Sequence, residues 1–471
     1  MNDTLVAVRQ AAEEGLDDSL QRLFSLLRIP SISTDPAHAG QVRKAAEALV
    51  SLLGELGFEA QARPTAGHPV VVARDHGAGP ALPTVLYYGH YDVQPPDPLD
   101  EWRTGPFDPV LEDGPHGRRI VARGAADDKG QLMTFIEAFR AWKKAAGRLP
   151  VNVTVMLEGE EESGSPSLIP FLEGARADLA ADVCVVSDTG MWDIDTPAVT
   201  YMLRGLVYLE ATLHGPGHDL HSGMYGGCAV NPNNALAAIV AQLHDARRRV
   251  TIEGFYDEVA EISAEERAMW ERLDFDEAAF LATGGLAADV GEAGRSLLER
   301  IWARPACDCN GIWGGYTGDG AKTVIPARAA AKVSCRLVAA QRAERIMAGL
   351  QKFFTDRTPP GCRFTFKTYG CSDAVRVPTD SPWLAAARAG LREAFGRQAV
   401  LIGTGGSIPV VGEIRRVLGI DSLLVGFGLD DDRVHSPNEK FELACFRRGI
   451  QAQAAMLGRL AAVARNGAAT G

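Results

Sequence analysis

The stretch VLYYGHYDVQP (Val85–Pro95) decides the fold and the chemistry that we predict for this chain. Its first half is an apolar run typical of a buried β-strand, and its second half places His90 and Asp92 where that strand ends. Side chains at positions i and i+2 of a strand share a face, so the carboxylate of Asp92 can orient the imidazole of His90. Taken alone, the pair also fits a surface or capping role.

Four further polar clusters lie after predicted strands or before a predicted helix: RGAADDKG (Arg123–Gly130), LEGEEESGS (Leu157–Ser165), VCVVSDTG (Val183–Gly190) and DDRVHSPNEKF (Asp431–Phe441). Separately, they are explained equally well by helix capping or by a solvated acidic loop. Open α/β sheets, however, bind ligands at the carboxyl ends of their strands. Imidazole and carboxylate are both zinc ligands, and two zinc ions about 3.5–4 Å apart can activate one water molecule. One shared metal site therefore explains the five clusters better than five separate structural roles.

Alternating apolar runs and amphipathic segments indicate the fold class. Helical spacing extends from Thr4 to Leu27, and strand-like runs begin near Val70, Thr84, Val151 and Val183. This alternation predicts an α/β fold with an open, largely parallel sheet.

A change of pattern near Tyr201 indicates a second domain. Strand-like stretches there flank a helix expected to begin at Pro232 after an Asn cap, and the first pattern returns near Asp373. A chain of 471 residues is also too long for one hydrophobic core. We predict a catalytic domain built from residues 1–203 and 375–471, with residues 204–374 inserted as an α+β domain.

Composition excludes several classes of protein. A formal net charge of -12 argues against a nucleic-acid partner, which requires a basic surface. The N-terminal segment is acidic where a signal peptide is basic, and no apolar run approaches the roughly 18 residues that cross a bilayer. Eight sparse cysteines fit a reducing compartment, so we expect a cytoplasmic protein without a membrane partner. The pair Cys307 and Cys309 has no second pair to complete a zinc knuckle and is interpreted as structural.

Taken together, GHYDVQP, RGAADDKG, EGEEESGS, SDTG and HSPNEK resemble the motifs of M20 metallopeptidases in their order and approximate spacing. The resemblance covers nearly the whole chain. It implies a zinc-peptidase-like open mixed sheet flanked by helices, with an inserted α+β lid domain that also mediates dimerisation. It further implies two divalent metal ions, zinc in the first place with manganese or cobalt as alternatives, because ligand type alone does not select the ion.

The resemblance assigns roles to the metal ligands residue by residue. Asp127 would bridge both ions, His90 and Asp188 would complete one position, and Glu162 and His435 would complete the other.

Two further residues take roles in the reaction from the same resemblance. Asp92 would orient His90, and Glu161 would be the general base that takes a proton from the metal-bridging water and passes it to the leaving amine.

Four other segments, HDLHSGMYGG, GAKTVIP, SCRLV and GTGGSIP, are similar to the carnosinase-like dipeptidases within this family, both beta-Ala-His and cytosolic nonspecific. By this resemblance His221, delivered from the partner subunit of a homodimer, would stabilise the oxyanion. Thr323, Arg336 and Ser407 would hold the carboxylate of a small peptide substrate.

The substrate class leaves alternatives open. Aspartate at position 188 favours dipeptide cleavage, because deacylases of the family tend to have glutamate there. The segment TYGCSDAVRVP (Thr368–Pro378) lacks the histidine that carnosinase-like chains usually carry in an HGG segment, so another group contacts the substrate or the specificity differs. The alternatives are an N-acyl or N-carbamoyl amino acid amidohydrolase of the same fold and a catalytically silent dimeric binding protein.

Overall fold

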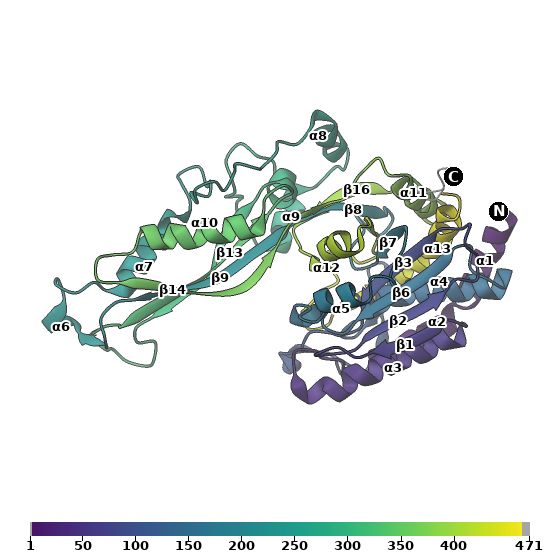
Figure 1. Cartoon of the computed structure of the whole chain (residues 1–471), viewed down its shortest axis with the longest axis horizontal. Helices are drawn as coiled ribbons and strands as arrows, with labels where there is room; N and C mark the ends of the chain where they lie inside the picture. The colour runs from purple at the N-terminus through teal and green to yellow at the C-terminus, as the bar shows by residue number, and fades with distance from the viewer. Residues whose placement is uncertain (1, 464–471) are drawn as a thin grey trace. The chain divides into compact units, whose positions relative to one another are not determined.

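The computed structural model describes residues 2–463, which divide into two compact units (Figure 1). Unit 1 comprises residues 2–201, 377–402 and 413–463, and unit 2 comprises residues 202–376 and 403–412. Each unit contains its own sheet and its own covering helices.

The largest sheet among the described residues is a nine-stranded mixed sheet. Its strands run in the order β1 (Glu59–Arg63), β2 (Val70–Asp75), β6 (Asn152–Glu158), β3 (Thr84–His90), β7 (Val183–Val186), β17 (Ser422–Leu424), β8 (Ala198–Leu203) and β15 (Val375–Arg376), and β16 (Val400–Thr404) pairs with β8. Parallel pairing joins β6, β3, β7 and β17, whereas β1, β2, β8 and β15 pair antiparallel. The predicted open mixed sheet is confirmed, but the expectation of a largely parallel sheet holds only for the central strands.

Helices cover both faces of the central strands, which explains why β3 and β6 are buried at every residue. The helices are α1 (Asn2–Glu14), α2 (Leu16–Leu27), α3 (Ala39–Glu55), α4 (Lys129–Ala146), α5 (Leu168–Gly174), α11 (Pro382–Phe395) and α13 (Leu443–Leu460). The short helix α12 (Pro409–Glu413) lies mostly in unit 2. The rings of Phe135 and Phe139 on α4 lie 5.0 and 5.1 Å from the ring of Tyr87 and fix this helix on β3. The helical segment predicted from Thr4 to Leu27 forms two helices separated at Gly15, since glycine has low helix propensity.

A small antiparallel sheet joins distant parts of unit 1. It consists of β18 (Lys440–Glu442), β5 (Gly117–Val121) and β4 (Val110–Gly114). Because β18 pairs with β5 from Lys440 opposite Val121, the segments before β18 and after β5 are brought together.

Unit 2 is built on a four-stranded antiparallel sheet in the order β11 (Ala306–Gly314), β13 (Arg328–Leu337), β9 (Gly205–His214) and β14 (Arg363–Ser372). Alternate residues of β9 are buried in a core with α7 (Pro232–Val240) and α10 (Ala343–Asp356). The predicted start of α7 is confirmed, since the Asn231 side chain accepts a hydrogen bond from the Asn233 amide. The unit also contains β10 (Leu220–His221) paired with β12 (Val324–Ile325), and the helices α6 (Ser222–Tyr225), α8 (Ala264–Glu271) and α9 (Glu277–Thr283).

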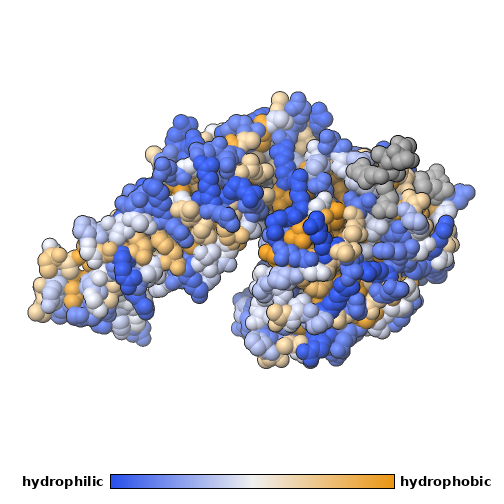
Figure 2. All heavy atoms as spheres, viewed as in Figure 1, coloured by the Kyte–Doolittle hydropathy of each residue, from blue (hydrophilic) through white to orange (hydrophobic). Residues whose placement is uncertain are grey.

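The side of the surface seen in Figure 2 is mostly hydrophilic, with apolar residues among the hydrophilic ones. Among residues 2–463, no helix combines the length and the apolar character that crossing a membrane requires.

Candidate metal centre and active site

Three neighbouring parallel strands deliver polar side chains to one edge of the unit 1 sheet. His90 is the last residue of β3, and Glu158 lies opposite it as the last residue of β6. The short helical turn η3 (Glu161–Ser163) follows β6, and Asp188 follows β7. The carboxyl ends of parallel strands meet at one edge, which is why these sequence-distant residues come together.

Two other segments complete the cluster. Asp127 lies between β5 and α4, and the Asp127–Asp128 peptide bond is cis. His435 lies between β17 and β18, in a segment that the pairing of β18 with β5 brings toward Asp127.

The five predicted metal ligands form two groups that share one carboxylate. His90, Asp127 and Asp188 form one group, and Asp127, Glu162 and His435 form the other. Within each group the potential ligand atoms all lie within 4.8 Å of one another. Asp127 is the shared member, so its position suits a bridge between two cations.

The hydrogen bonds of Asp127 show how the two groups are arranged. Its Oδ1 lies 3.0 Å from Nε2 of His90, and its Oδ2 lies 2.9 Å from Nε2 of His435. Nε2 of His435 also lies 3.2 Å from Oε2 of Glu162. Each oxygen of Asp127 thus faces a different histidine, as a bridging carboxylate requires.

The pKa shifts around Asp127 indicate what a cation would replace. Hydrogen bonds to Asp127 and Glu162 raise the pKa of His435 to about 10. Burial opposes the charged form of His90, but its contacts with Asp127 and Asp92 hold its pKa well above the ordinary value. Burial and the neighbouring carboxylates raise the pKa of Asp188 well above its usual range. In the metal-free chain, protons therefore neutralise the crowded carboxylates, and divalent cations bound by the same donors can take over that role.

Asp92 connects the end of β3 to the glutamate turn. Its Oδ1 lies 3.3 Å from Nδ1 of His90, whose other ring nitrogen faces Asp127. The same carboxylate accepts hydrogen bonds from the backbone amides of Glu161 (3.3 Å) and Glu162 (3.0 Å). Since Nδ1 faces an acceptor, Nε2 of His90 can present its lone pair to a cation.

Glu161 belongs to neither ligand group, although it directly precedes Glu162. Burial, with contributions from the nearby carboxylates of Glu162, Asp127 and Asp92, raises its pKa to about 7. A carboxyl group that titrates near neutral pH can both accept and donate a proton under physiological conditions.

The four predicted substrate-contact residues lie in unit 2, at two separate places. Nη1 of Arg336 donates a hydrogen bond of 2.9 Å to the Ser407 hydroxyl. His221 lies on β10, where Nδ1 accepts a hydrogen bond from the Gly223 amide (3.0 Å). Thr323 directly precedes β12, and its carbonyl accepts a hydrogen bond from the Ser222 amide (3.0 Å).

Sequence reasoning missed several polar contacts inside the quoted motifs. Nε2 of Gln94 donates a hydrogen bond of 2.8 Å to Oε2 of Glu162. The Asp128 carboxylate accepts a hydrogen bond from the His90 amide (3.1 Å), and Glu439 accepts one from the Asp127 amide (3.1 Å). All three residues stand in the motifs VQP, ADDKG and PNEK, but their residue types alone gave no reason to prefer them over their neighbours.

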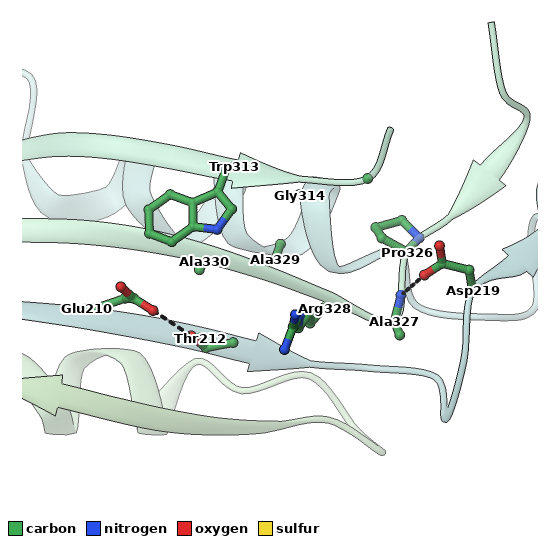
Figure 3. Close-up of a pocket in the computed structure, with 11 residues that line it drawn as sticks. Glu210, Thr212, Asp219, Trp313, Gly314, Pro326, Ala327, Arg328, Ala329 and Ala330 are labelled. Carbon is green, nitrogen blue, oxygen red and sulfur yellow. Dashed lines mark hydrogen bonds between the residues drawn. The ribbon is translucent and has the colours of Figure 1, made fainter. Parts of the chain in front are cut away.

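A cavity of about 510 Å³ in unit 2 is distinct from the metal centre (Figure 3). Small residues of β13 form its floor, Trp313 lines it from β11, and Glu210 lines it from β9. Asp219, which accepts a hydrogen bond from the Ala327 amide (2.9 Å), lines it as well. No residue of the two ligand groups lines this cavity. The size of a cavity alone therefore does not identify the active site.

The two donor groups share one carboxylate and lie where the parallel strands of an α/β sheet end. This arrangement is typical of dinuclear metallohydrolases. The chain belongs to peptidase family M20/M25/M40, whose sequence profile matches residues 86–459. It is therefore a metallopeptidase, a hydrolase acting on peptide bonds, of a family that depends on two metal ions, and its predicted resemblance to the carnosinase-like subgroup is confirmed.

Three relatives illustrate the similarity. The Cys-Gly metallodipeptidase DUG1 of Saccharomyces cerevisiae is 30% identical over 97% of this chain and 98% of its own length. The crystal structure of human carnosine dipeptidase 1 has a TM-score of 0.82 and 27% identity, covering 98% of this chain and 99% of the other. The M20 metallo-carboxypeptidase Sso-CP2 of Sulfolobus solfataricus has a TM-score of 0.84 and 31% identity, covering 94% and 99%.

Proposed function

We propose that this metallopeptidase is a dipeptidase that uses two divalent ions, zinc in the first place with manganese or cobalt as alternatives. The observation that carries the proposal is the shared position of Asp127 between two complete donor groups, with Glu161 beside them but in neither. Nitrogen and carboxylate oxygen donors suit zinc, which is why we place it first.

The chain's own residues divide the work of hydrolysis. When bound, the two ions polarise the scissile carbonyl and acidify a water molecule. Asp127, His90, Asp188, Glu162 and His435 would hold those ions. Glu161 takes a proton from the attacking water and transfers it to the departing amine, a role supported by its raised pKa of about 7. No serine or cysteine nucleophile is needed.

The carboxylate of the substrate is assigned to Arg336, Ser407 and Thr323, and the developing oxyanion to His221. The hydrogen bond between Arg336 and Ser407 supports this assignment, because it orients a planar guanidinium suited to a carboxylate. Two of the relatives described above are named as dipeptidases, which supports a substrate of this size.

The placement of these residues within unit 2 supports a homodimer through this unit. Arg336 lies near the end of β13, eight positions after Arg328, which corresponds to roughly 27 Å along a strand. Both His221 and Thr323 lie before the start of β13: His221 is the last residue of β10, and Thr323 directly precedes its partner strand β12. A dipeptide is too short to contact both places in one chain, so we assign His221, and Thr323 beside it, to the active site of the partner subunit.

We also propose a cytoplasmic location. All eight cysteines lie within the described residues and are free thiols, as expected in a reducing compartment.

A substrate panel on metal-reconstituted protein tests the proposed function. Unblocked dipeptides are compared with N-acyl and N-carbamoyl amino acids, and with longer peptides bearing a free carboxyl end. The last class is included because Sso-CP2 is named a carboxypeptidase. We expect the dipeptides to give the highest kcat/KM. Faster release of acyl or carbamoyl groups would favour the amidohydrolase, faster trimming of long peptides would favour the carboxypeptidase, and no turnover of any class would favour the silent binding protein.

A further inference from the structure

A buried ion pair joins three of the motifs that form the metal centre. Arg123 and Glu439 are 1% and 0% exposed, and Nη1 of Arg123 donates a hydrogen bond of 2.8 Å to Oε2 of Glu439. Nη2 of Arg123 also donates a hydrogen bond of 3.2 Å to the carbonyl of Pro95, at the end of the motif that begins with His90. The pair therefore connects the segments that carry His90, Asp127 and His435.

The Glu439 carboxylate also holds the turn that presents Asp127. Its Oε1 accepts hydrogen bonds from the amides of Ala126 (2.8 Å) and Asp127 (3.1 Å), and its Oε2 accepts one from the Gly124 amide (3.0 Å). With the bond from Arg123, one buried carboxylate accepts four hydrogen bonds, so both of its oxygens are fully used.

On the other side, Glu439 belongs to the segment that carries His435, and this segment is strained. Arg433, His435 and Asn438 have φ values of 58°, 62° and 60°, in the left-handed region that non-glycine residues rarely adopt. Such conformations persist only where the surroundings enforce them. Asn438 provides one anchor through hydrogen bonds with the Arg103 amide (2.9 Å) and the Glu101 carbonyl (2.8 Å), and Glu439 provides the next.

We propose that Glu439 is a positioning residue that fixes Asp127 and His435 at the spacing required by the second metal position, formed by Asp127, Glu162 and His435. The inference rests on the proposed function, since it presupposes two ions. Glu439 touches neither an ion nor the substrate in this role. It acts through the backbone of Asp127 and through the strained segment that carries His435.

Metal titration of Glu439→Gln tests this role. Glutamine keeps the size of the side chain but replaces one acceptor oxygen with an NH2 group. That group cannot accept the hydrogen bonds that the backbone amides or the Arg123 guanidinium donate to Glu439. The matched control is Glu137→Gln, because Glu137 is also a buried carboxylate of unit 1 bonded to an arginine, Arg22 (2.7 and 2.6 Å), but belongs to neither ligand group.

Metal-free wild-type, Glu439→Gln and Glu137→Gln proteins are titrated with zinc by calorimetry and with cobalt by absorption spectroscopy. We expect Glu439→Gln to bind the second ion about 10–100-fold more weakly, with a changed cobalt spectrum for that ion. The first ion should be weakened less, because His90 and Asp188 remain in place beside the shared Asp127. Glu137→Gln should bind both ions as the wild type does. Equal affinities in Glu439→Gln and the wild type would overturn the inference, and so would an equal loss in both variants.

A further variant guards against failure to fold. If circular dichroism shows that Glu439→Gln is unfolded, Glu439→Asp is titrated in its place, because it keeps the charge but withdraws the carboxylate by one methylene. Selective weakening of the second ion supports the inference, and unchanged affinities overturn it. A wild-type chain that bound fewer than two ions would overturn the proposed function itself, which distinguishes the two failures.

Discussion

At Glu161, metal binding and catalysis can be measured separately. It lies beside Glu162 but outside both ligand groups. We predict that Glu161→Gln keeps two bound ions per chain while kcat falls by about 10²–10⁴-fold, the usual contribution of a general base. Elemental analysis and steady-state kinetics on the same preparation check this. Retained turnover with full metal content would refute the assigned role. The neighbouring substitution Glu160→Gln is an unsuitable control, because Glu160 accepts hydrogen bonds from the amides of His68 and Ser167.

The protonation of His435 predicts how metal binding depends on pH. In the metal-free chain its pKa is raised to about 10 by Asp127 and Glu162, so the imidazole is protonated at neutral pH. An ion can bind there only when this proton leaves, and the apparent affinity therefore rises with pH, about tenfold per unit for each proton released. Calorimetry between pH 6 and 8, in buffers of different ionisation enthalpy, counts the protons. A pH-independent affinity for both ions would contradict the prediction.

Residue types and order were enough to single out the side chains of the candidate site, but not the contacts that support them. The positions of the polar motifs at predicted strand and helix ends indicated one shared metal site. The resemblance to M20 metallopeptidases then selected the ligands, and the structure brings these five into two adjoining groups: His90, Asp127, Glu162, Asp188 and His435. Gln94 and Glu439 were missed, since their contacts with Glu162 and Asp127 depend on side-chain direction and backbone conformation, which a single sequence does not specify.

At the scale of elements, the contact between α11 and α13 depends on a glycine. A Cβ atom added to Gly390 on α11 would lie 2.7 Å from the backbone N and Cα of Met456 on α13, and backbone cannot move aside as a flexible side chain can. We predict that Gly390→Ala lowers the free energy of unfolding by about 1–3 kcal/mol. Denaturant unfolding followed by circular dichroism checks this.

Gly54 provides the control for this prediction, because it lies on α3 with no atom within 4 Å of an added Cβ. Gly54→Ala should instead stabilise the chain by about 0.5–1 kcal/mol, since alanine loses less conformational entropy in a helix than glycine does. If the two substitutions had the same effect, close helix packing at Gly390 would not explain the result.

The strands differed in how well the sequence predicted them. The inner strands β2, β3, β6 and β7 were expected because each contains a short, mostly apolar run. The edge strand β1 was not, since its sequence EAQAR is polar and partly exposed. Strand direction was also mispredicted for β2, because an apolar run looks the same in a parallel and an antiparallel pair.

At the scale of the whole molecule, the assignment of His221 to a partner's active site can be tested by mixing two inactive variants. His221→Ala keeps its own metal ligands, and Asp127→Ala keeps His221. After random subunit exchange, half of the dimers contain one complete site, so activity should return to a value approaching about one quarter of the wild type. The readout is dipeptide hydrolysis before and after exchange.

The control mixture replaces Asp127→Ala with the double variant Asp127→Ala/His221→Ala, which has no histidine to donate and should restore nothing. Absence of rescue in the test mixture, with exchange verified by mass spectrometry of the assembled dimers, would place His221 in its own chain's site or outside the reaction.

The position of β17 has a consequence for biosynthesis. Ser422–Leu424 is inserted between β7 and β8, although both of those strands are translated long before it. A ribosome-bound chain that ends before Ser422 therefore leaves the fully buried β7 as an open edge, which is prone to aggregation. Until the last part of the polypeptide emerges, this edge stays unpaired, and the chain also lacks His435, a member of the second ligand group.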